Sequence, residues 1–253
     1  MDLGLADRVF LLTGASRGLG FATAQALVAD GARVVISSRD ADRVDDAVAE
    51  LGGPEHALGV TADLADPSTP RELVHVAQER FGRLDGALIS VGGPAPGTAA
   101  SMSDDQWTSA FETVFLGSVR AARTFASALP EGGAIAMVLS TSAKTPLTGL
   151  GLSNGFRPGL AMVAKDMADE FAPRGVRVLS VLPGRFMTDR NKELFAASDD
   201  PVEAAERAAS AIPLRRIGEP SEFGRVAAFL LSPAASYVTG VAVAVDGGAM
   251  RAL

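Results

Sequence analysis

The chain has 253 residues, a formal net charge of −7 and no cysteine. The lack of cysteine excludes disulfide bonds and thiolate metal sites, and two histidines are too few for a histidine-rich metal centre. Because the lysines and arginines form no run along the chain, we expect neither a nucleic-acid partner nor binding to an anionic membrane surface. The N-terminus has no basic region followed by an apolar core, so we expect a cytoplasmic protein without a signal peptide.

Short apolar segments alternate with longer helical patterns along the chain, as in repeated βαβ units that build a parallel sheet. Several of the apolar segments are almost unbroken Val, Ile, Leu and Ala, which is typical of strands covered on both faces. Strands are predicted at 8–12, 33–37, 57–61, 86–90, 134–139, 177–182 and 241–245. Helices are predicted at about 18–30, 42–51, 70–81, 104–129, 157–172 and 220–231, the fourth of them behind a capping box at Ser103.

This order of elements predicts a single α/β domain over residues 1–253, a Rossmann-type doubly wound parallel sheet of about seven strands with helices on both faces. No linker or internal repeat divides it. Residues 185–218 are the least regular, and an insertion of that length is expected to form a lid or substrate loop, with a short helix over 201–211. Residues 226–245 are uncharged, but Pro233 and several polar residues interrupt them, which favours a helix end, a turn and a buried strand over a membrane span.

The first predicted strand leads into the sequence Thr-Gly-Ala-Ser-Arg-Gly-Leu-Gly at residues 13–20, and a helix follows. Glycines at 14, 18 and 20 allow backbone N–H groups to approach a pyrophosphate at the N-terminus of that helix. Any tight turn from strand to helix can use glycines, so the pattern alone is a weak signal. Its place near the start of the chain, with a second strand after it, favours nucleotide binding.

The pattern Gly14-x-x-x-Gly18-x-Gly20 resembles the glycine motif of the short-chain dehydrogenase/reductase family, and the resemblance extends over nearly the whole chain. The C-terminal part, from residues 212–214 through 237–240 to 245–248, is similar to the signature of β-ketoacyl carrier-protein reductases in that family. The resemblance implies a small-molecule substrate. It also implies a homo-oligomer, a tetramer or dimer, in which the helices at about 104–129 and 157–172 pack against a neighbouring subunit.

The resemblance further implies which residues hold the cofactor. Asp63 and Leu64 resemble the adenine contact of the family, and Pro183-Gly184 with Thr188 resembles the segment that holds the nicotinamide carboxamide. The expected cofactor-binding residues are Gly14, Ser16, Arg17, Gly18, Leu19, Gly20, Ser38, Arg39, Asp63, Leu64, Pro183, Gly184 and Thr188.

The end of the second strand indicates which cofactor is bound. An acidic residue there would bind the ribose hydroxyls of NAD, but this chain has Ser38 followed by Arg39, and Arg17 lies in the glycine loop. Two guanidinium groups suit the 2′-phosphate of NADP(H). The alternative is that both arginines are simply solvated, and the neighbouring Asp40 weakens the argument. We favour NADP(H) over NAD(H).

The catalytic positions depart from the family, in which a serine, a tyrosine and a lysine carry the reaction. Ser140 follows the fifth strand at the position of the serine, but Ser153 and Arg157 stand where the tyrosine and lysine are expected. No shift of the alignment restores the pair, since Tyr237, the only tyrosine, belongs to the C-terminal signature. An aliphatic hydroxyl is a much weaker acid than a phenol, and arginine keeps its proton, so Ser153 would need help to transfer a proton.

Three other residues are candidates for the missing chemistry. Lys144, four residues after Ser140, is a possible proton donor, or else a solvated loop lysine. Arg185 is a possible partner for an acidic group of the substrate, or else an exposed arginine of the lid, and Asn154 is a possible hydrogen-bond donor to an oxyanion. Trp107, Phe111 and Phe115, which recur at helical spacing, are expected in the core.

The sequence therefore predicts an NADP(H)-dependent oxidoreductase that acts on a carbonyl, an alcohol or an acyl thioester through an atypical catalytic site. Two alternatives remain open: a non-catalytic relative that binds nucleotide, and a dehydratase or isomerase that uses the same pocket without net hydride transfer. The prediction of the reaction rests on resemblance in fold and cofactor site.

Overall fold

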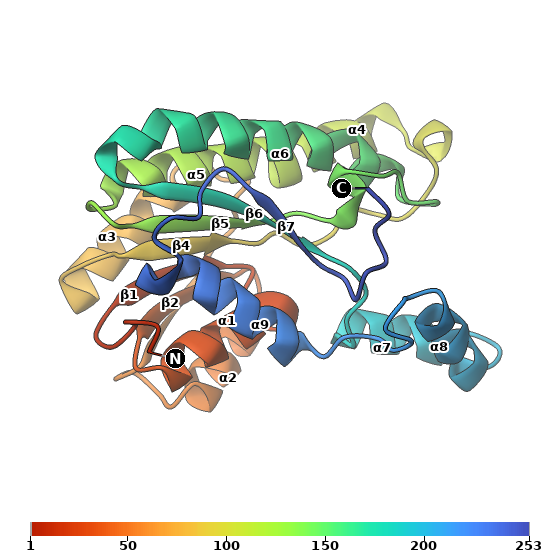
Figure 1. The fold of residues 1–253 in the computed structure, drawn as a ribbon, viewed down its shortest axis with the longest axis horizontal. Helices are drawn as coiled ribbons and strands as arrows, with labels where there is room; N and C mark the ends of the chain where they lie inside the picture. The colour runs from red at the N-terminus through yellow and green to blue at the C-terminus, as the bar shows by residue number, and fades with distance from the viewer. Residues whose placement is uncertain (1, 253) are drawn as a thin grey trace.

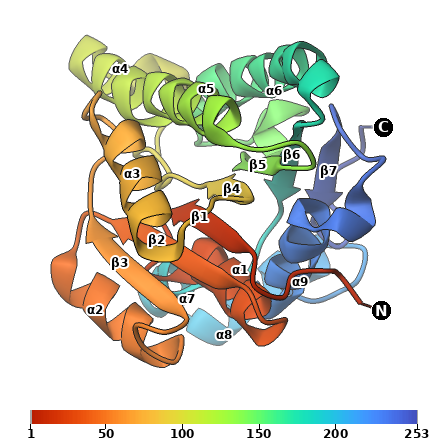
Figure 2. The same cartoon turned by 90° about the vertical axis from the view of Figure 1, so that its left-hand side faces the viewer.

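The computed structural model describes residues 2–252 of the chain, and its centre is a seven-stranded parallel sheet in the order β3-β2-β1-β4-β5-β6-β7 (Figures 1 and 2). The strands are β1 (Val9–Thr13), β2 (Arg33–Ser38), β3 (Ala57–Thr61), β4 (Gly86–Ile89), β5 (Ala134–Val138), β6 (Arg177–Pro183) and β7 (Ala242–Val245). All seven predicted strands are confirmed, with ends that differ by no more than one residue. Their apolar runs were sufficient to locate them.

Helices cover both faces of this sheet. One face carries α1 (Gly18–Ala29), α2 (Ala41–Glu50) and α9 (Pro220–Leu231), and the other carries α3 (Thr69–Phe81), α4 (Asp104–Ala110), α5 (Gly117–Ala128) and α6 (Gly151–Phe171) (Figure 2). Successive strand residues alternate between the two sides: Leu11 packs with the core under α3, α5 and α6, whereas Phe10 and Leu12 pack with the core under α1 and α9. Burial of both faces explains the apolar strands, and the predicted doubly wound fold is confirmed.

The strand order reverses between β1 and β4, and this reversal positions the site. After β1 the chain builds outward through β2 and β3 and then returns to place β4 on the other side of β1. Helices that leave the two strands diverge to opposite faces, so a crevice opens at their carboxyl ends. Thr13 and Ser90 join these ends, because the Thr13 hydroxyl donates to the Ser90 carbonyl at 2.8 Å and accepts from the Ser90 N–H at 3.0 Å.

Two helices differ from their predicted bounds. The helix predicted over 104–129 is divided into α4, a π-helical segment at Phe111–Leu116, and α5. The predicted capping box at its start is present, with hydrogen bonds between Ser103 and Gln106 in both directions. Helix α6 begins at Gly151, earlier than the predicted start at 157, and it includes Pro158 in its interior. Sequence alone favours a loop before a proline, and here tertiary packing overrides that preference.

The lid segment, residues 185–218, contains the predicted short helix as α8 (Pro201–Ser210) and a second helix, α7 (Asp189–Ala196), which the sequence did not indicate. Both lie beyond the carboxyl ends of the strands (Figure 1). The base of the lid is closed by two backbone hydrogen bonds, from Met187 to Gly218 at 2.8 Å and from Gly218 to Arg185 at 3.1 Å. Across residues 2–252, no helix has the length and apolar character that crossing a membrane requires.

Candidate functional site

The glycine loop between β1 and α1 packs so tightly that side chains are excluded at two of its glycines. A Cβ added at Gly14, whose φ is +57°, would lie 2.6 Å from the carbonyl oxygen of Ser90, and one added at Gly20 would lie 2.7 Å from the carbonyl oxygen of Gly14. Residue Arg17 precedes α1, and no side chain caps the first turn of this helix. The N–H groups at the start of α1 therefore remain available to an anion.

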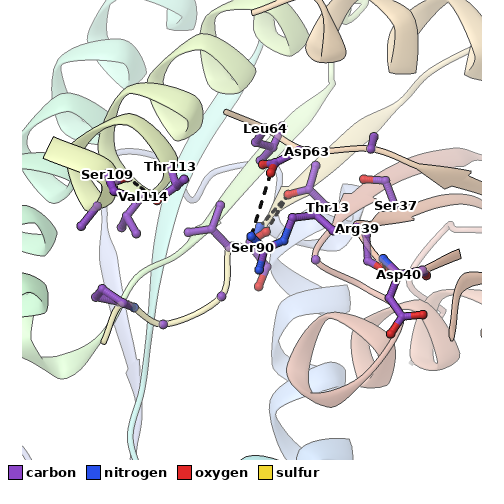
Figure 3. Close-up of a pocket in the computed structure, with 18 of the residues that line it drawn as sticks. Thr13, Ser37, Arg39, Asp40, Asp63, Leu64, Ser90, Ser109, Thr113 and Val114 are labelled. Carbon is purple, nitrogen blue, oxygen red and sulfur yellow. Dashed lines mark hydrogen bonds and ion pairs between the residues drawn. The ribbon is translucent and has the colours of Figure 1, made fainter. Parts of the chain in front are cut away.

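A cavity of about 700 Å³ extends from this loop across the reversal point between β1 and β4 (Figure 3). Its lining includes seven of the predicted cofactor residues, namely Gly14, Ser16, Arg17, Ser38, Arg39, Asp63 and Leu64. The opposite wall is formed by residues of the segment after β4 and of α4 and the π-helical segment, including Ser109, Thr113 and Val114 (Figure 3). The volume and the glycine cradle fit a dinucleotide.

The remaining predicted cofactor residues are not among those that line this cavity. Gly18 and Leu19 belong to the first turn of α1 together with Gly20, and Pro183 ends β6. The Gly184 N–H donates to the carbonyl of Val245 at 2.9 Å, which fixes this segment to β7. Thr188 lies at the other side of the glycine loop, since its methyl carbon is 3.8 Å from a Cβ built at Gly18. The structure thus brings the segment after β6 to the glycine loop.

Three arginines line the end of the cavity near β2. The sequence analysis identified Arg17 and Arg39 but missed Arg43, which lies in the first turn of α2. Asp40 is occupied as the N-cap of α2: it accepts the Arg43 backbone N–H at 3.2 Å and pairs with the Arg43 guanidinium at 3.1 Å. Arg39 is 3.9 Å from Asp63 (Figure 3). Beside Ser38, three arginines therefore stand against two carboxylates, each of which pairs with one arginine.

Ser140 and Ser153 do not contact each other directly. Ser140 lies just after β5, and its hydroxyl accepts the N–H of Ser142 at 3.1 Å. Ser153 lies in the first turn of α6 and shares a 2.9 Å hydrogen bond with the hydroxyl of Ser142, and both serines are buried. Ser142 is a residue that the sequence analysis missed. A backbone turn brings it beside Ser153, and no sequence motif marks such a contact.

Arg157 is a buried cation with few partners. Its side chain donates one hydrogen bond, to the carbonyl of Val138 at 3.1 Å, and its Nε has no partner within the described part of the chain. Burial lowers the pKa of the Arg157 guanidinium to about 10, so the group remains protonated at neutral pH. Another buried arginine, Arg177, donates to the carbonyls of Leu230, Val238 and Ser232. Arg157 therefore retains hydrogen-bonding capacity that Arg177 has used.

The other candidates have different surroundings. Lys144 is exposed at the end of the short turn after Ser140. The Asn154 amide bonds the backbone of Leu147 on both sides, at 2.9 Å each, so it holds the preceding loop and uses one of its two N–H donors there. Arg185 lies over the ring of Phe195, 6.0 Å from its centroid, and lines a second cavity of about 410 Å³.

The expectation that Trp107, Phe111 and Phe115 belong to the core is confirmed in part for Phe115, which is half-buried against the core, and is wrong for Phe111, which is exposed. They form an aromatic cluster with Phe156 of α6, with ring centroids 5.4 to 6.2 Å apart. Phe111 is 41% exposed, and Met162 on the same helix as Phe156 is 71% exposed. Helical spacing correctly indicates a shared face, but it does not show whether that face meets the core of the same subunit.

Known proteins resemble this chain over almost its full length. Residues 14–250 match the family model described as Enoyl-(Acyl carrier protein) reductase. The chain is 34% identical to L-rhamnose 1-dehydrogenase (NAD(P)(+)) of Azotobacter vinelandii, in an alignment that covers 96% of this chain and 97% of that protein.

Two solved structures share the fold over the whole length of both chains. One is L-sorbose reductase from Gluconobacter frateurii complexed with NADPH and L-sorbose, with a TM-score of 0.91 and 29% identity. The other is a short chain oxidoreductase from Pseudomonas aeruginosa described as containing an atypical catalytic center, with a TM-score of 0.92 and 28% identity. The chain is therefore an oxidoreductase of the short-chain dehydrogenase/reductase family, whose class of cofactor is NAD(P)(H).

Proposed function

We propose that the protein is an NADP(H)-dependent oxidoreductase that interconverts a carbonyl and an alcohol, or reduces an acyl thioester, through an atypical catalytic site. The observation that carries the choice of cofactor is the group of arginines Arg17, Arg39 and Arg43 around Ser38 at the end of the cavity. Guanidinium groups bind a phosphate through paired, charge-assisted hydrogen bonds. L-sorbose reductase, which shares the fold, is described in complex with NADPH.

In this proposal the family resemblance assigns each part of the cofactor to residues of the cavity. The pyrophosphate lies on the glycine loop, at Gly14, Ser16, Gly18, Leu19 and Gly20. Asp63 and Leu64 contact the adenine, whereas Pro183, Gly184 and Thr188 hold the nicotinamide carboxamide. The buried Arg157 would take the place of the family's lysine beside the nicotinamide ribose.

The bound cofactor would supply or accept the hydride, and the side chains of this chain would handle the proton. Ser140 orients the substrate carbonyl through its hydroxyl. Ser153 is held by Ser142 at 2.9 Å, so these two hydroxyls can pass a proton but are weak acids. Arg157 stabilises negative charge without relaying protons. The proposed proton donor is Lys144, an exposed residue four positions after Ser140.

Comparison of the two cofactors tests this proposal. Titration calorimetry should show NADPH binding at least about tenfold more tightly than NADH, because a charge-assisted bond to phosphate contributes roughly 1.5–3 kcal/mol. Arg39→Asp should narrow or reverse the difference, whereas Arg33→Gln, at the opposite end of β2, should leave it unchanged. Equal or tighter binding of NADH by the unmodified protein would refute the proposed preference.

We also propose that residues 1–253 form a single domain and that the protein is cytoplasmic. It assembles as a homo-oligomer, a tetramer or dimer. The family resemblance indicates that α4, α5 and α6, which correspond to the helices predicted at about 104–129 and 157–172, form the contact surface. The exposed side chains of Phe111 and Met162 support this, since exposed apolar clusters on soluble proteins commonly mark interfaces.

A further inference from the structure

Arg190, in the first turn of α7, reaches from the lid to the cofactor cavity. Its guanidinium lies against Gly93, in the segment after β4: a Cβ built at Gly93 would overlap Nη1 and would lie 3.4 Å from Cζ and 3.7 Å from Nη2. Gly93 itself lines the cavity, together with Gly92 and Pro94. The absence of a side chain at position 93 is what allows this contact.

The surrounding structure fixes where Arg190 stands. Thr188 faces Gly18 of the glycine loop at the base of α7. Asn191, the next residue after Arg190, donates from its side chain to the carbonyl of Phe186 at 2.7 Å. These two contacts hold the start of α7 between the glycine loop and the segment that follows β6. The start of α7, which carries Arg190, is therefore held beside the glycine loop.

The charge on Arg190 has no partner. Across residues 2–252 its side chain takes part in no ion pair or hydrogen bond, whereas its neighbour Asp189 pairs with Lys192 at 3.7 Å. The other lid arginine near the base, Arg185, lies over Phe195 and faces the second cavity. Arg190 is thus an exposed guanidinium beside Gly93 of the cavity wall, and within the described part of the chain its five donors have no protein partner.

We propose that Arg190 selects substrates that carry a carboxylate, so that the enzyme acts on oxo acids and their hydroxy acid counterparts. This inference rests on the proposed function, because it assumes that the substrate enters beside the nicotinamide end of the cavity. A guanidinium binds a carboxylate through two parallel hydrogen bonds, which favours acids over neutral molecules. The pyrophosphate of the cofactor is the other anion within reach, but the uncapped start of α1 and Arg17 already provide for it.

The test compares matched acidic and neutral ligands. Oxo acids of increasing chain length, such as 2-oxobutanoate and 4-oxopentanoate, and their methyl esters are titrated into the protein saturated with NADP⁺, and the affinity of NADPH is measured separately. The variants are Arg190→Gln and Gly93→Ala, in which an added methyl group displaces the guanidinium without removing its charge. Lys192→Gln is the control, since it removes a positive charge from the same helix.

The unmodified protein should bind at least one acid about tenfold more tightly than its ester. Arg190→Gln should abolish that preference with little change in NADPH affinity, Gly93→Ala should weaken the preference, and Lys192→Gln should retain it. The proposal fails if the unmodified protein shows no preference, if Arg190→Gln retains it, or if Arg190→Gln weakens NADPH binding instead. A preference for acids without hydride transfer to any of them would contradict the proposed function and leave the role of Arg190 intact.

Discussion

At the scale of single residues, the site combines a glycine loop typical of the family with a serine and an arginine where the family's tyrosine and lysine are expected. The glycine loop is constrained by its own backbone, as the close approach of Gly14 to Ser90 shows. Ser153 shares a hydrogen bond with Ser142, and Arg157, on the same helix, is buried. Hydride transfer to a carbonyl also needs an acid at the oxygen, and neither serine is a good one.

Restoring the family's acid should therefore raise activity. We predict that Ser153→Tyr combined with Arg157→Lys increases the rate of reduction of a generic ketone, because general acid catalysis is typically worth ~10²–10⁴ in rate. Either single change should gain less, since the lysine tunes the pKa of the tyrosine. The measurement is steady-state NADPH oxidation with the affinity for NADPH determined in parallel.

This experiment needs controls for the packing of the larger tyrosine side chain. Because Ser153 is buried against Ser142, the larger phenol needs space, and the double variant should also be tested with Ser142→Ala. Thermal unfolding identifies variants that lose activity through instability. An unmodified enzyme that is already fast on simple ketones would contradict the argument, because the proton would then travel by a route that these residues do not provide.

Sequence analysis identified the residues that belong to a linear motif and missed those that folding brings in. Arg17 and Arg39 could be predicted because they belong to the glycine loop and the end of β2. Arg43, Ser142 and Arg190 could not, because their relevance depends on a helix turn, a backbone turn and a contact across the cavity. Such contacts depend on three-dimensional distance, which a single sequence does not contain.

At the scale of elements, apolar runs located the strands, whereas glycine and proline obscured the helices. The helix predicted at about 157–172 begins at Gly151 and includes Gly155 and Pro158, two residues of low helix propensity. The long helix predicted before β5 is interrupted by the π-helical segment Phe111–Leu116. Insertions of this kind often occur at functional sites, and here the segment supplies Thr113 and Val114 to the cavity wall.

The aromatic cluster of α4, the π-helical segment and α6 leads to a prediction about assembly. If this face packs against a neighbouring subunit, Met162→Glu should lower the oligomer mass, because a buried carboxylate without a partner is strongly unfavourable. Light scattering coupled to size exclusion measures the mass. Val202→Glu on α8, equally exposed but far from this face in sequence, should leave the mass unchanged. A monomer in the unmodified protein at micromolar concentration would refute the prediction.

At the scale of the whole molecule, the fold explains why cofactor binding and catalysis can diverge. The crevice between β1 and β4 follows from the strand order and is independent of the residues at 153 and 157. The lid reaches the same crevice from the other end of the chain through Arg190. The doubly wound sheet could be predicted from the alternation of elements, but the substrate could not, because it is recognised by side chains of the lid and the loops.

The most direct test of the account follows the hydride itself. NADPH is mixed with the protein and a panel of oxo acids, simple ketones and 3-oxoacyl thioesters, while the absorbance of the reduced nicotinamide and the mass of the products are recorded together. The account predicts that NADPH is consumed in equal amount to the reduced product, fastest with an oxo acid and slowly with simple ketones. Product that forms without consumption of NADPH, or bound NADPH that is never oxidised by any member of the panel, would contradict it.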